Sequence, residues 1–407
     1  MGDKGPLPSG LRLTPLDPVF RERPHEYLDR LRAEDPVHRD TELGRVFFTR
    51  FEDVKAIVGN RALYVDPRKA PPGSYHRRTA GAALSERQPS MLSLDDPDHR
   101  RIRGLVSQAF NQRSVEAFRP RIRAIASALL DEVEGQESFD VIADYAAPLP
   151  TIVIAEMLGV DPGEQAQFKQ WSDGLVLSLS PRRTAEQDAA LHVASDALDA
   201  FFKNQIAQRR EQRRGDLIGA MVAAEEEGAR LTQDEIITTC NLLLVAGNVT
   251  TTDLIGNAVF ALLRHPDQLA LLRRQPELIR NAVEEVLRWD PPVAQTSRLT
   301  LDEMQVGGVT VHPGDSLVTS LLAAGRDPAA HAEPHRFDIQ RADTSHFAFG
   351  GGAHHCLGAP LARAEAQIAL DVLLNRCPEI ALDPAHSVEH KRAPPFNGLA
   401  ELWVRVR

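Results

Sequence analysis

The chain has 407 residues, with 47 Lys or Arg against 57 Asp or Glu, so its formal net charge is −10 at pH 7. Hydrophobic residues make up 43% and charged residues 26%, proportions that are typical of a globular protein and exclude a disordered, collagen-like or coiled-coil chain. The acidic balance argues against binding to nucleic acid, because phosphate backbones are bound by surfaces with an excess of basic residues.

The N-terminal segment and the apolar stretches predict a soluble protein. Residues 1–16 have no apolar run of signal-peptide length and are interrupted by Pro and Gly, which predicts a flexible tail. The most apolar stretches, around 141–160 and 242–246, are interrupted by Asp144, Pro148 and Pro150 or are too short to cross a bilayer. We therefore expect no membrane partner.

The three cysteines, Cys240, Cys356 and Cys377, are far apart and form no Cys-x-x-Cys pair. Their odd number and wide spacing fit neither a disulfide framework nor a zinc ribbon. This cysteine usage indicates a reducing cytoplasm.

Apolar residues recur every three or four positions through most of the chain, which predicts a mainly α-helical fold. Strand patterns are few, and in chain order they lie at 37–39, 45–49, 309–311, 317–320 and 402–406. No internal repeat or long Gly/Ser linker marks a boundary. The prediction is a single domain over 17–407, mainly α with a small β region.

One predicted helix is unusually long. Thr232 and Glu235 have the spacing of a capping box, and an apolar pattern then runs from Ile236 through Leu263 until Pro266 forbids continuation. At 1.5 Å per residue this helix exceeds ~40 Å.

The centre of this helix, 245–252, combines Gly247 with β-branched residues, which individually weaken a helix. The hydroxyl of Thr250 can bond to the carbonyl of Ala246 and open a polar notch where a ligand is bound. The alternative is a weak spot that a buried helix tolerates, and this segment alone does not separate the two.

The densest chemical pattern lies at 349–358, ahead of an Ala- and Leu-rich helix through about Leu374. Backbone N–H groups of the glycines and the helix N-terminus favour the anion of Cys356, which suits a nucleophile or a metal ligand. A buried inert cysteine is the usual alternative, but three glycines and two histidines in one loop argue against it. Zinc is disfavoured because no second cysteine lies near, and a phosphate loop because no Gly-Lys-Ser/Thr follows.

The pattern Phe-Gly-x-Gly-x-His-x-Cys-x-Gly, matched from Phe349 to Gly358, resembles the haem loop of the cytochromes P-450. Glu285 and Arg288 match the family's Glu-x-x-Arg, and 334–338 matches its Pro-x-x-Phe-Asp segment. Segments 326–328 and 96–103 agree as well, and the resemblance, strongest to soluble bacterial members, covers about 17–407. It implies a cytochrome P-450 fold with a long central helix over a buried haem b.

The resemblance makes Cys356 the thiolate ligand of the haem iron. It also implies that Glu285 and Arg288 form a structural ion-pair network with Arg336. The haem contacts that it implies are His99, Arg103, Arg298, Phe349, Gly350, His354, Cys356 and Gly358.

The long helix resembles the family's oxygen-binding helix, with Gly247, Thr250 and Thr251 as catalytic residues. It departs from the family at Val249, which stands where an acid normally precedes the threonine. Because valine cannot supply a proton, either Thr250 works with water and another polar group or the enzyme reacts differently.

The substrate contacts that the resemblance implies are mostly apolar or small, which suits a lipophilic substrate. The polar exceptions include Gln295 and Asn397, which could equally be satisfied loop residues. The implied contacts are Leu242, Ala246, Val293, Ala294, Thr296 and Phe396. The pattern does not separate terpenoid, steroid, fatty-acid and other secondary-metabolite substrates.

The function that the resemblance implies is a monooxygenase that inserts one atom of O2 into a hydrophobic small molecule. No flavin or iron–sulfur module follows the last strand, so we expect NAD(P)H-derived electrons through ferredoxin reductase and ferredoxin, and a monomeric enzyme. The alternatives are a peroxygenase driven by hydrogen peroxide, which the missing acid at Val249 leaves open, and a haem protein that binds ligands without turnover.

Overall fold

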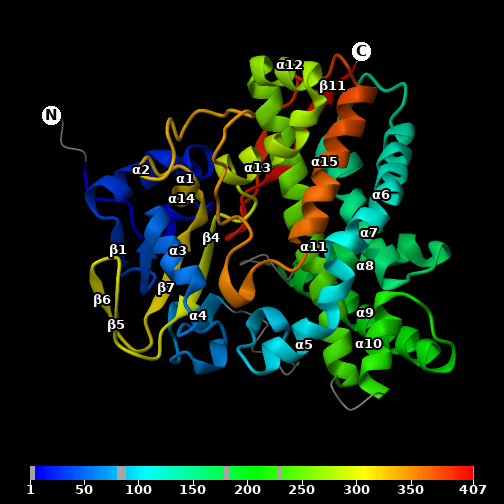
Figure 1. Ribbon diagram of the computed structural model, residues 1–407, viewed down its shortest axis with the longest axis horizontal. Helices are drawn as coiled ribbons and strands as arrows, with labels where there is room; N and C mark the ends of the chain where they lie inside the picture. The colour runs from blue at the N-terminus through cyan, green and yellow to red at the C-terminus, as the bar shows by residue number, and fades with distance from the viewer. Residues whose placement is uncertain (1–4, 80–88, 178–182, 227–230, 407) are drawn as a thin grey trace. The chain divides into compact units, whose positions relative to one another are not determined.

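The computed structural model describes residues 5–79, 89–177, 183–226 and 231–406. They form two compact units, each assembled from three stretches of the chain. The first unit comprises Met1–Gly81, Arg264–Cys356 and Val388–Ala400, and the second comprises Ala82–Leu263, Leu357–Ser387 and Glu401–Arg407. Helices predominate in the described residues and the strands are short, which confirms the predicted mainly α fold with a small β region (Figure 1).

The first unit contains the larger sheet and a set of mostly short helices. Its helices are α1 (Pro18–Glu22), α2 (Pro24–Glu34), α3 (Phe51–Gly59), α4 (Tyr75–Thr79), α12 (Pro266–Arg274), α13 (Ile279–Trp289) and α14 (Leu321–Gly325), with the 3-10 turns η1 (Gly10–Leu13), η2 (Pro67–Lys69), η9 (Pro276–Leu278) and η10 (Gly352–His354). Its strands are β1 (Val37–Asp40), β2 (Arg45–Phe48), β4 (Gln295–Leu299), β5 (Met304–Val306), β6 (Val309–Val311), β7 (Ser316–Ser320), β9 (Glu389–His390) and β10 (Leu399–Glu401).

Four strands of the first unit form one mixed sheet in the order β1-β2-β7-β4. The β2–β7 pair is parallel, and the two outer pairs are antiparallel. Successive side chains of a strand point to opposite faces, and on β2 Phe47 joins one apolar cluster while Val46 and Phe48 join another. The sheet is therefore covered on both faces, which explains why every residue of β2 is buried.

Part of the segment that we expected to be a flexible tail is packed against the first unit. Leu13 is 1% exposed and lies in the cluster that holds Phe20, Leu28 and Leu31. The backbone N–H of Gly10 also donates to the carboxylate of Asp40 at 3.1 Å. The expectation of a loose tail is therefore wrong for these residues, because one leucine among polar and breaking residues is enough to dock the segment.

The second unit is mostly helical. Its helices are α5 (Asp98–Val106), α6 (Gln112–Glu132), α7 (Pro148–Leu158), α8 (Gln165–Val176), α9 (Ala185–Glu211), α10 (Leu217–Glu226), α11 (Gln233–Arg264) and α15 (Ala359–Arg376), with the short turns η4 (Met91–Ser93), η5 (Ser107–Phe110), η6 (Val141–Ala146, a π-helical turn) and η7 (Pro162–Glu164). Its strands β3 (Ser138–Asp140), β11 (Trp403–Arg405) and β8 (Ala381–Leu382) form a small antiparallel sheet in the order β3-β11-β8.

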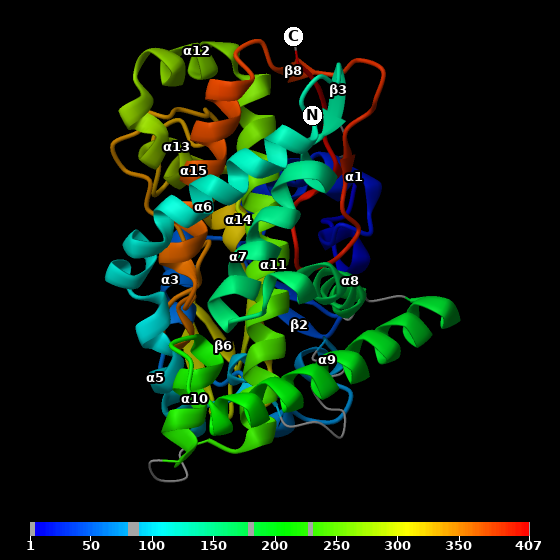
Figure 2. The ribbon, with the colours of Figure 1, turned by 90° about the vertical axis from the view of Figure 1, so that its right-hand side faces the viewer.

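Helix α11 is the long helix that the apolar pattern predicts (Figure 2). The predicted capping box is present: the Glu235 backbone N–H donates to the Thr232 hydroxyl at 3.2 Å, and the Thr232 backbone N–H donates to the Glu235 carboxylate at 2.8 Å. Its 32 residues continue through Gly247 without a break. Most of its residues from Asn248 onward are buried, so tertiary packing compensates for the weak helix formers at its centre.

Two segments are long and apolar enough to cross a membrane when length and composition alone are considered. They are Val141–Leu158 and Gln233–Arg264, and 67% and 72% of their most apolar windows are buried inside the protein. The expectation that the segment around 242–246 is too short is wrong, because it belongs to the continuous helix α11. This degree of burial is that of core helices, so length and composition are weak evidence for membrane spans here.

Candidate functional site

The glycines of the 349–358 loop are required by its geometry. Gly350 and Gly352 have φ angles of 67° and 63°, which side-chain-bearing residues rarely adopt. A Cβ on Gly351 would lie 2.7 Å from Cγ2 of Val58, and one on Gly352 would lie 2.7 Å from the Val58 carbonyl oxygen. The loop therefore packs backbone-first against the end of α3, and three glycines allow this approach.

This loop holds Cys356 at the surface. The Cys356 backbone N–H donates to the Phe349 carbonyl at 2.8 Å and closes the loop, and α15 begins at Ala359, three residues further on. Cys356 is exposed, whereas Cys240 is buried and Cys377 partly so. Burial raises the pKa of both the Cys240 and Cys377 thiols. Cys356 is therefore the accessible thiol suited to ligate a metal.

Each unit supplies basic residues from the predicted haem set. In the first unit, Arg298 on β4 is 6% exposed, and its guanidinium donates to the Ser297 carbonyl at 2.9 Å. In the second unit, His99 on α5 is 3% exposed and contacts the Asp96 carboxylate at 3.4 Å. Burial lowers the pKa of His99, against the raising effect of Asp96. Arg103 follows one helical turn after His99 on α5.

Helix α11 has an accessible strip in a stretch that is otherwise largely buried. Ala246 is exposed, and Leu242 and Thr250, each one turn away on the same face, are partly exposed. The Thr250 hydroxyl donates to the Ala246 carbonyl at 2.8 Å, as the sequence suggests. A Cβ on Gly247 would meet nothing within 4 Å, so open space lies beside the strip. The strip thus presents one hydroxyl among small and apolar groups.

Thr251 does not lie on this strip. It is 2% exposed, and the next residue, Thr252, is 3% exposed and donates to the Ala146 carbonyl at 3.3 Å. The predicted catalytic residue Thr251 therefore lies on a different face of α11 from Thr250, because adjacent residues on an α-helix project about 100° apart. Its catalytic role stays a prediction.

Glu365 on α15 is a functional candidate that the sequence analysis missed. It is 2% exposed, and burial raises the pKa of its carboxyl group to about 8 although a hydrogen bond with Thr251 lowers it. A carboxyl group with this pKa still holds its proton at neutral pH and can donate it. The available signal was one acidic residue between Ala364 and Ala366, with the apolar Leu361 and Ile368 about one helical turn to either side.

Glu285 and Arg288 form a fully buried ion pair on α13, with Arg288 Nε 2.7 Å from Glu285 Oε2. Their third partner differs from the expected one. Arg341 Nε lies 3.2 Å from Glu285, whereas the side chain of Arg336 is 56% exposed and pairs with Glu333 at 3.2 Å. The expected role of the Arg336 guanidinium is therefore wrong, because the chain turns back beyond it and brings Arg341 to the carboxylate.

The predicted substrate residues of the first unit lie around a short turn at 395–398. Val293 and Phe396 form an isolated β-bridge, and the Ala294 backbone N–H donates to the Pro395 carbonyl at 2.8 Å. The two polar candidates are satisfied internally: the Gln295 amide donates to the Tyr75 hydroxyl at 3.3 Å, and the Asn397 amide donates to Asp290 at 2.7 Å. Gln295 on β4 and Asn397 in the turn at 395–398 therefore have structural partners.

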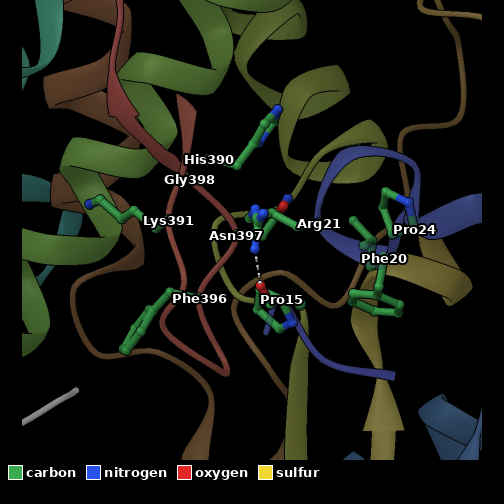
Figure 3. A pocket seen from close by; sticks show the side chains of 11 residues that line it. Pro15, Phe20, Arg21, Pro24, His390, Lys391, Phe396, Asn397 and Gly398 are labelled. Atoms are coloured by element: carbon green, nitrogen blue, oxygen red, sulfur yellow. Dashed lines mark hydrogen bonds between the residues drawn. The ribbon is translucent and has the colours of Figure 1, made fainter. Parts of the chain in front are cut away.

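A small hollow in the first unit is lined in part by Ala294 and Phe396. Figure 3 shows this hollow, with Arg21 donating to the Pro15 carbonyl at 3.0 Å. Its water-accessible space is about 10 Å³, which is room for about one water molecule. It is therefore too small to be a substrate chamber.

These residues fit the haem that the resemblance implies. An accessible thiol in a tight glycine loop suits a thiolate iron ligand. Arg298 in the first unit, and Arg103 and His99 in the second, are basic groups of the kind that pairs with propionate carboxylates. Gly351 and Gly352 bring the loop backbone against α3, where any side chain would collide.

Comparisons with known proteins agree with this assignment. The family model for cytochrome P450 matches residues 45–397. Cytochrome P450 107B1 of Saccharopolyspora erythraea is 39% identical over 97% of both chains, and the monooxygenase PikC of Streptomyces venezuelae is 38% identical over 98% of this chain and 95% of that relative.

Solved structures are similar throughout the chain. Myxobacterial cytochrome P450 CYP267B1 in complex with myristic acid has a TM-score of 0.87 and 36% identity, covering 97% of this chain and 98% of that one. P450BioI in complex with a hexadecenoic-acid-ligated acyl carrier protein has a TM-score of 0.85 and 35% identity, covering 95% and 100%. The chain therefore belongs to the cytochrome P450 family and is a haem-containing monooxygenase.

Proposed function

We propose that this enzyme inserts one atom of O2 into a hydrophobic small molecule, with two electrons supplied by a separate ferredoxin. When bound, the haem supplies the redox chemistry that activates dioxygen. In this proposal Cys356 is the iron ligand, Arg298, Arg103, His99 and His354 pair with the haem propionates, and Phe349, Gly350 and Gly358 shape the loop around the thiolate.

The observation that carries the proposal is the buried carboxyl group of Glu365, which is 2% exposed and hydrogen-bonds to Thr251 on α11. Oxygen-dependent turnover consumes protons, and Val249 provides none. Glu365 has a pKa of about 8 and hydrogen-bonds to Thr251, which directly follows Thr250 on α11. We propose that Glu365 is the proton reservoir and that Thr250 presents the proton on the accessible strip. This pairing favours the monooxygenase over the peroxygenase, which needs no such supply.

The substrate that these residues suit is lipophilic and makes few polar contacts. Leu242, Ala246, Val293 and Phe396 are apolar, and Gln295 and Asn397 are occupied by bonds within the protein. Thr296 is a further polar candidate, and its hydroxyl accepts a hydrogen bond from the Arg298 guanidinium at 3.4 Å. Related structures hold testosterone or myristic acid, and one relative is named 6-deoxyerythronolide B hydroxylase. Steroid, fatty-acid and macrolide classes are therefore the first to test.

We also propose that the enzyme is cytoplasmic and monomeric and that the two units act as one domain. The three cysteines, Cys240, Cys356 and Cys377, form no disulfide with one another, which is usual in a reducing compartment. The chain passes repeatedly between the units, so neither is a contiguous segment of the kind that folds alone.

The test compares two sources of oxidising equivalents for the haem-loaded enzyme. A screen of fatty acids, steroids and macrolides by haem spectral shift first identifies a ligand. Product formation is then measured with NAD(P)H, ferredoxin reductase, ferredoxin and isotopically labelled O2, and in parallel with hydrogen peroxide alone. We expect product that carries one labelled oxygen atom and depends on ferredoxin.

The rival functions give different results in the same experiment. A peroxygenase forms product at least as fast with peroxide alone and gains nothing from ferredoxin. A haem protein without turnover shows the spectral shift but forms product under neither condition. Either result would overturn the proposal.

A further inference from the structure

Three metal-ligating side chains meet in the first unit, away from the cysteine loop. His25 and Asp29 lie one helical turn apart on α2, and His335 comes from the segment that follows α14. One potential ligand atom from each of the three residues lies within 4.8 Å of the others. Asp29 Oδ2 is 3.2 Å from His335 Nε2, and the ring centroids of His25 and His335 are 5.8 Å apart.

His25 is a buried imidazole without hydrogen-bond partners. Both of its ring nitrogens are inaccessible to solvent and neither is bonded. An unsatisfied buried polar group costs about 1–3 kcal/mol in general, so such groups call for an explanation. His38 Nδ1 contacts Asp35 at 2.7 Å and His76 Nε2 contacts the Val65 carbonyl at 2.9 Å, whereas His331 of the same unit, like His25, has two buried ring nitrogens without a partner. Of these two unbonded imidazoles, only that of His25 belongs to a group of three metal-ligating side chains among the described residues. A bound cation would give a nitrogen of His25 the partner that it lacks.

We propose that His25, Asp29 and His335 bind one divalent transition-metal ion, with Zn²⁺ as the representative ion. Two imidazoles and one carboxylate form a donor set that suits zinc and similar ions and not Ca²⁺ or Mg²⁺, which prefer oxygen ligands. Zinc bonds of about 2.0–2.2 Å require the three ligand atoms to close in slightly from their present separations.

The surroundings of Asp29 leave one carboxylate oxygen for the metal. Arg32 donates to Oδ1 of Asp29, while Oδ2 faces His335. Arg32 is itself held by the Ala323 carbonyl at 3.0 Å. A hydrogen bond that orients a ligating carboxylate in this way is a common feature of metal sites.

The site also has a route for the ion and a place for a fourth ligand. Asp29 and His335 line a surface hollow of about 500 Å³, so water can reach the open coordination position. The positive charges of Arg32 and Arg326 oppose a cation here. Asp327, 3.8 Å from Arg32, offsets part of this charge. We therefore expect reversible binding and not a permanently occupied structural site.

A metal at this site would tie α2 to the segment that the buried ion-pair network holds. The Trp289 indole N–H donates to the His335 carbonyl at 2.9 Å, and Arg288 donates to the Pro334 carbonyl at 3.0 Å. Binding to the native state stabilises it: at a metal concentration 100 times Kd the unfolding equilibrium constant falls about 100-fold. The metal would thus stabilise the first unit without taking part in the haem chemistry.

The test uses the haem-loaded full-length enzyme after dialysis against a chelator. Zn²⁺ is titrated in competition with a chromophoric chelator, and thermal unfolding is followed with and without Zn²⁺. We expect one high-affinity Zn²⁺ per chain, a raised Tm, and loss of both effects in His335→Gln. Asp29→Asn provides a second variant that removes a different ligand.

His312→Gln is the matched control. His312 also lies 3.2 Å from a carboxylate, that of Glu303, but it has no second histidine in a three-ligand group among the described residues. This variant should retain Zn²⁺ binding. The proposal is overturned if the wild-type enzyme binds no more Zn²⁺ than His335→Gln does, or if His312→Gln loses the same affinity. Neither result depends on which substrate or electron donor the enzyme uses.

Discussion

Two buried glutamates, one in each unit, are treated in opposite ways by their surroundings. Glu285 on α13 is 0% exposed and accepts hydrogen bonds from Arg288, Arg341 and the Asp338 backbone N–H. Glu365 on α15 is 2% exposed, and burial raises the pKa of its carboxyl group to about 8. Similar burial therefore gives an ion-paired structural group where guanidinium groups surround the carboxylate, and a proton donor where the carboxyl group hydrogen-bonds to a threonine hydroxyl.

The largest effect should come from breaking the pair around Glu285. Arg288→Ala should lower the free energy of unfolding by about 3–5 kcal/mol, because it leaves a buried carboxylate with less compensation. Urea denaturation with haem content measured in parallel checks this. Loss of less than about 1 kcal/mol would show that the network contributes little.

The choice of the third partner can be tested with two arginine variants. Arg341→Ala should destabilise the protein more than Arg336→Ala does, because Arg341 contacts Glu285 and the exposed Arg336 makes surface ion pairs worth at most about 1 kcal/mol. The same urea series provides the measurement. The reverse order would restore Arg336 to the network.

Glu365→Gln should change how stability depends on pH. In the native state the pKa of Glu365 is about 8, above its ordinary value of 4.5. Between these two values the folded state binds the extra proton, so the wild-type enzyme loses stability as pH rises from about 4.5 to about 8, by up to about 1.4 kcal/mol per unit. Glu365→Gln should lack this slope. If the urea midpoints of both proteins change with pH in the same way from pH 5.5 to 8.5, the raised pKa of Glu365 is contradicted.

A smaller effect is expected on the fraction of NAD(P)H electrons that ends in product. Thr250→Ala should lower the product formed per NAD(P)H consumed several-fold, because the accessible strip then has no hydroxyl to present a proton. Thr252→Val is the control, since its hydroxyl is bonded to the Ala146 carbonyl away from the strip. An equal yield of product per NAD(P)H in Thr250→Ala and the wild type would show that the Thr250 hydroxyl does not take part in proton supply.

The smallest expected effect concerns the hydrogen bond to Glu365. Thr251→Val removes a contact that lowers the pKa of Glu365, so the alkaline limb of the pH–rate profile should move upward by about one unit. An unchanged alkaline limb would show that Glu365 does not supply the proton.

The local features of the molecule were predictable from the sequence. The capping box at Thr232 and Glu235 defines the start of α11, and the glycine loop around Cys356 predicts an accessible thiol ahead of a helix. Both signals arise from residues within a few positions of one another, where steric and hydrogen-bonding preferences act directly. The sequence pattern did not predict strand β4, because Gln295–Leu299 is largely polar. This segment is a strand because it pairs with β7.

Partners distant along the chain were decided by the tertiary structure. The sequence placed Glu285 and Arg288 on one helix face, but the turn after Arg336 selected Arg341 as their third partner. In the same way, the packing of α15 in the second unit put Glu365 beside Thr251 and raised its pKa. The sequence by itself determined which residues could carry chemistry. Burial and long-range contact determined which of them are charged, protonated or accessible, because desolvation and Coulomb interactions depend on neighbours in space and not on neighbours in sequence.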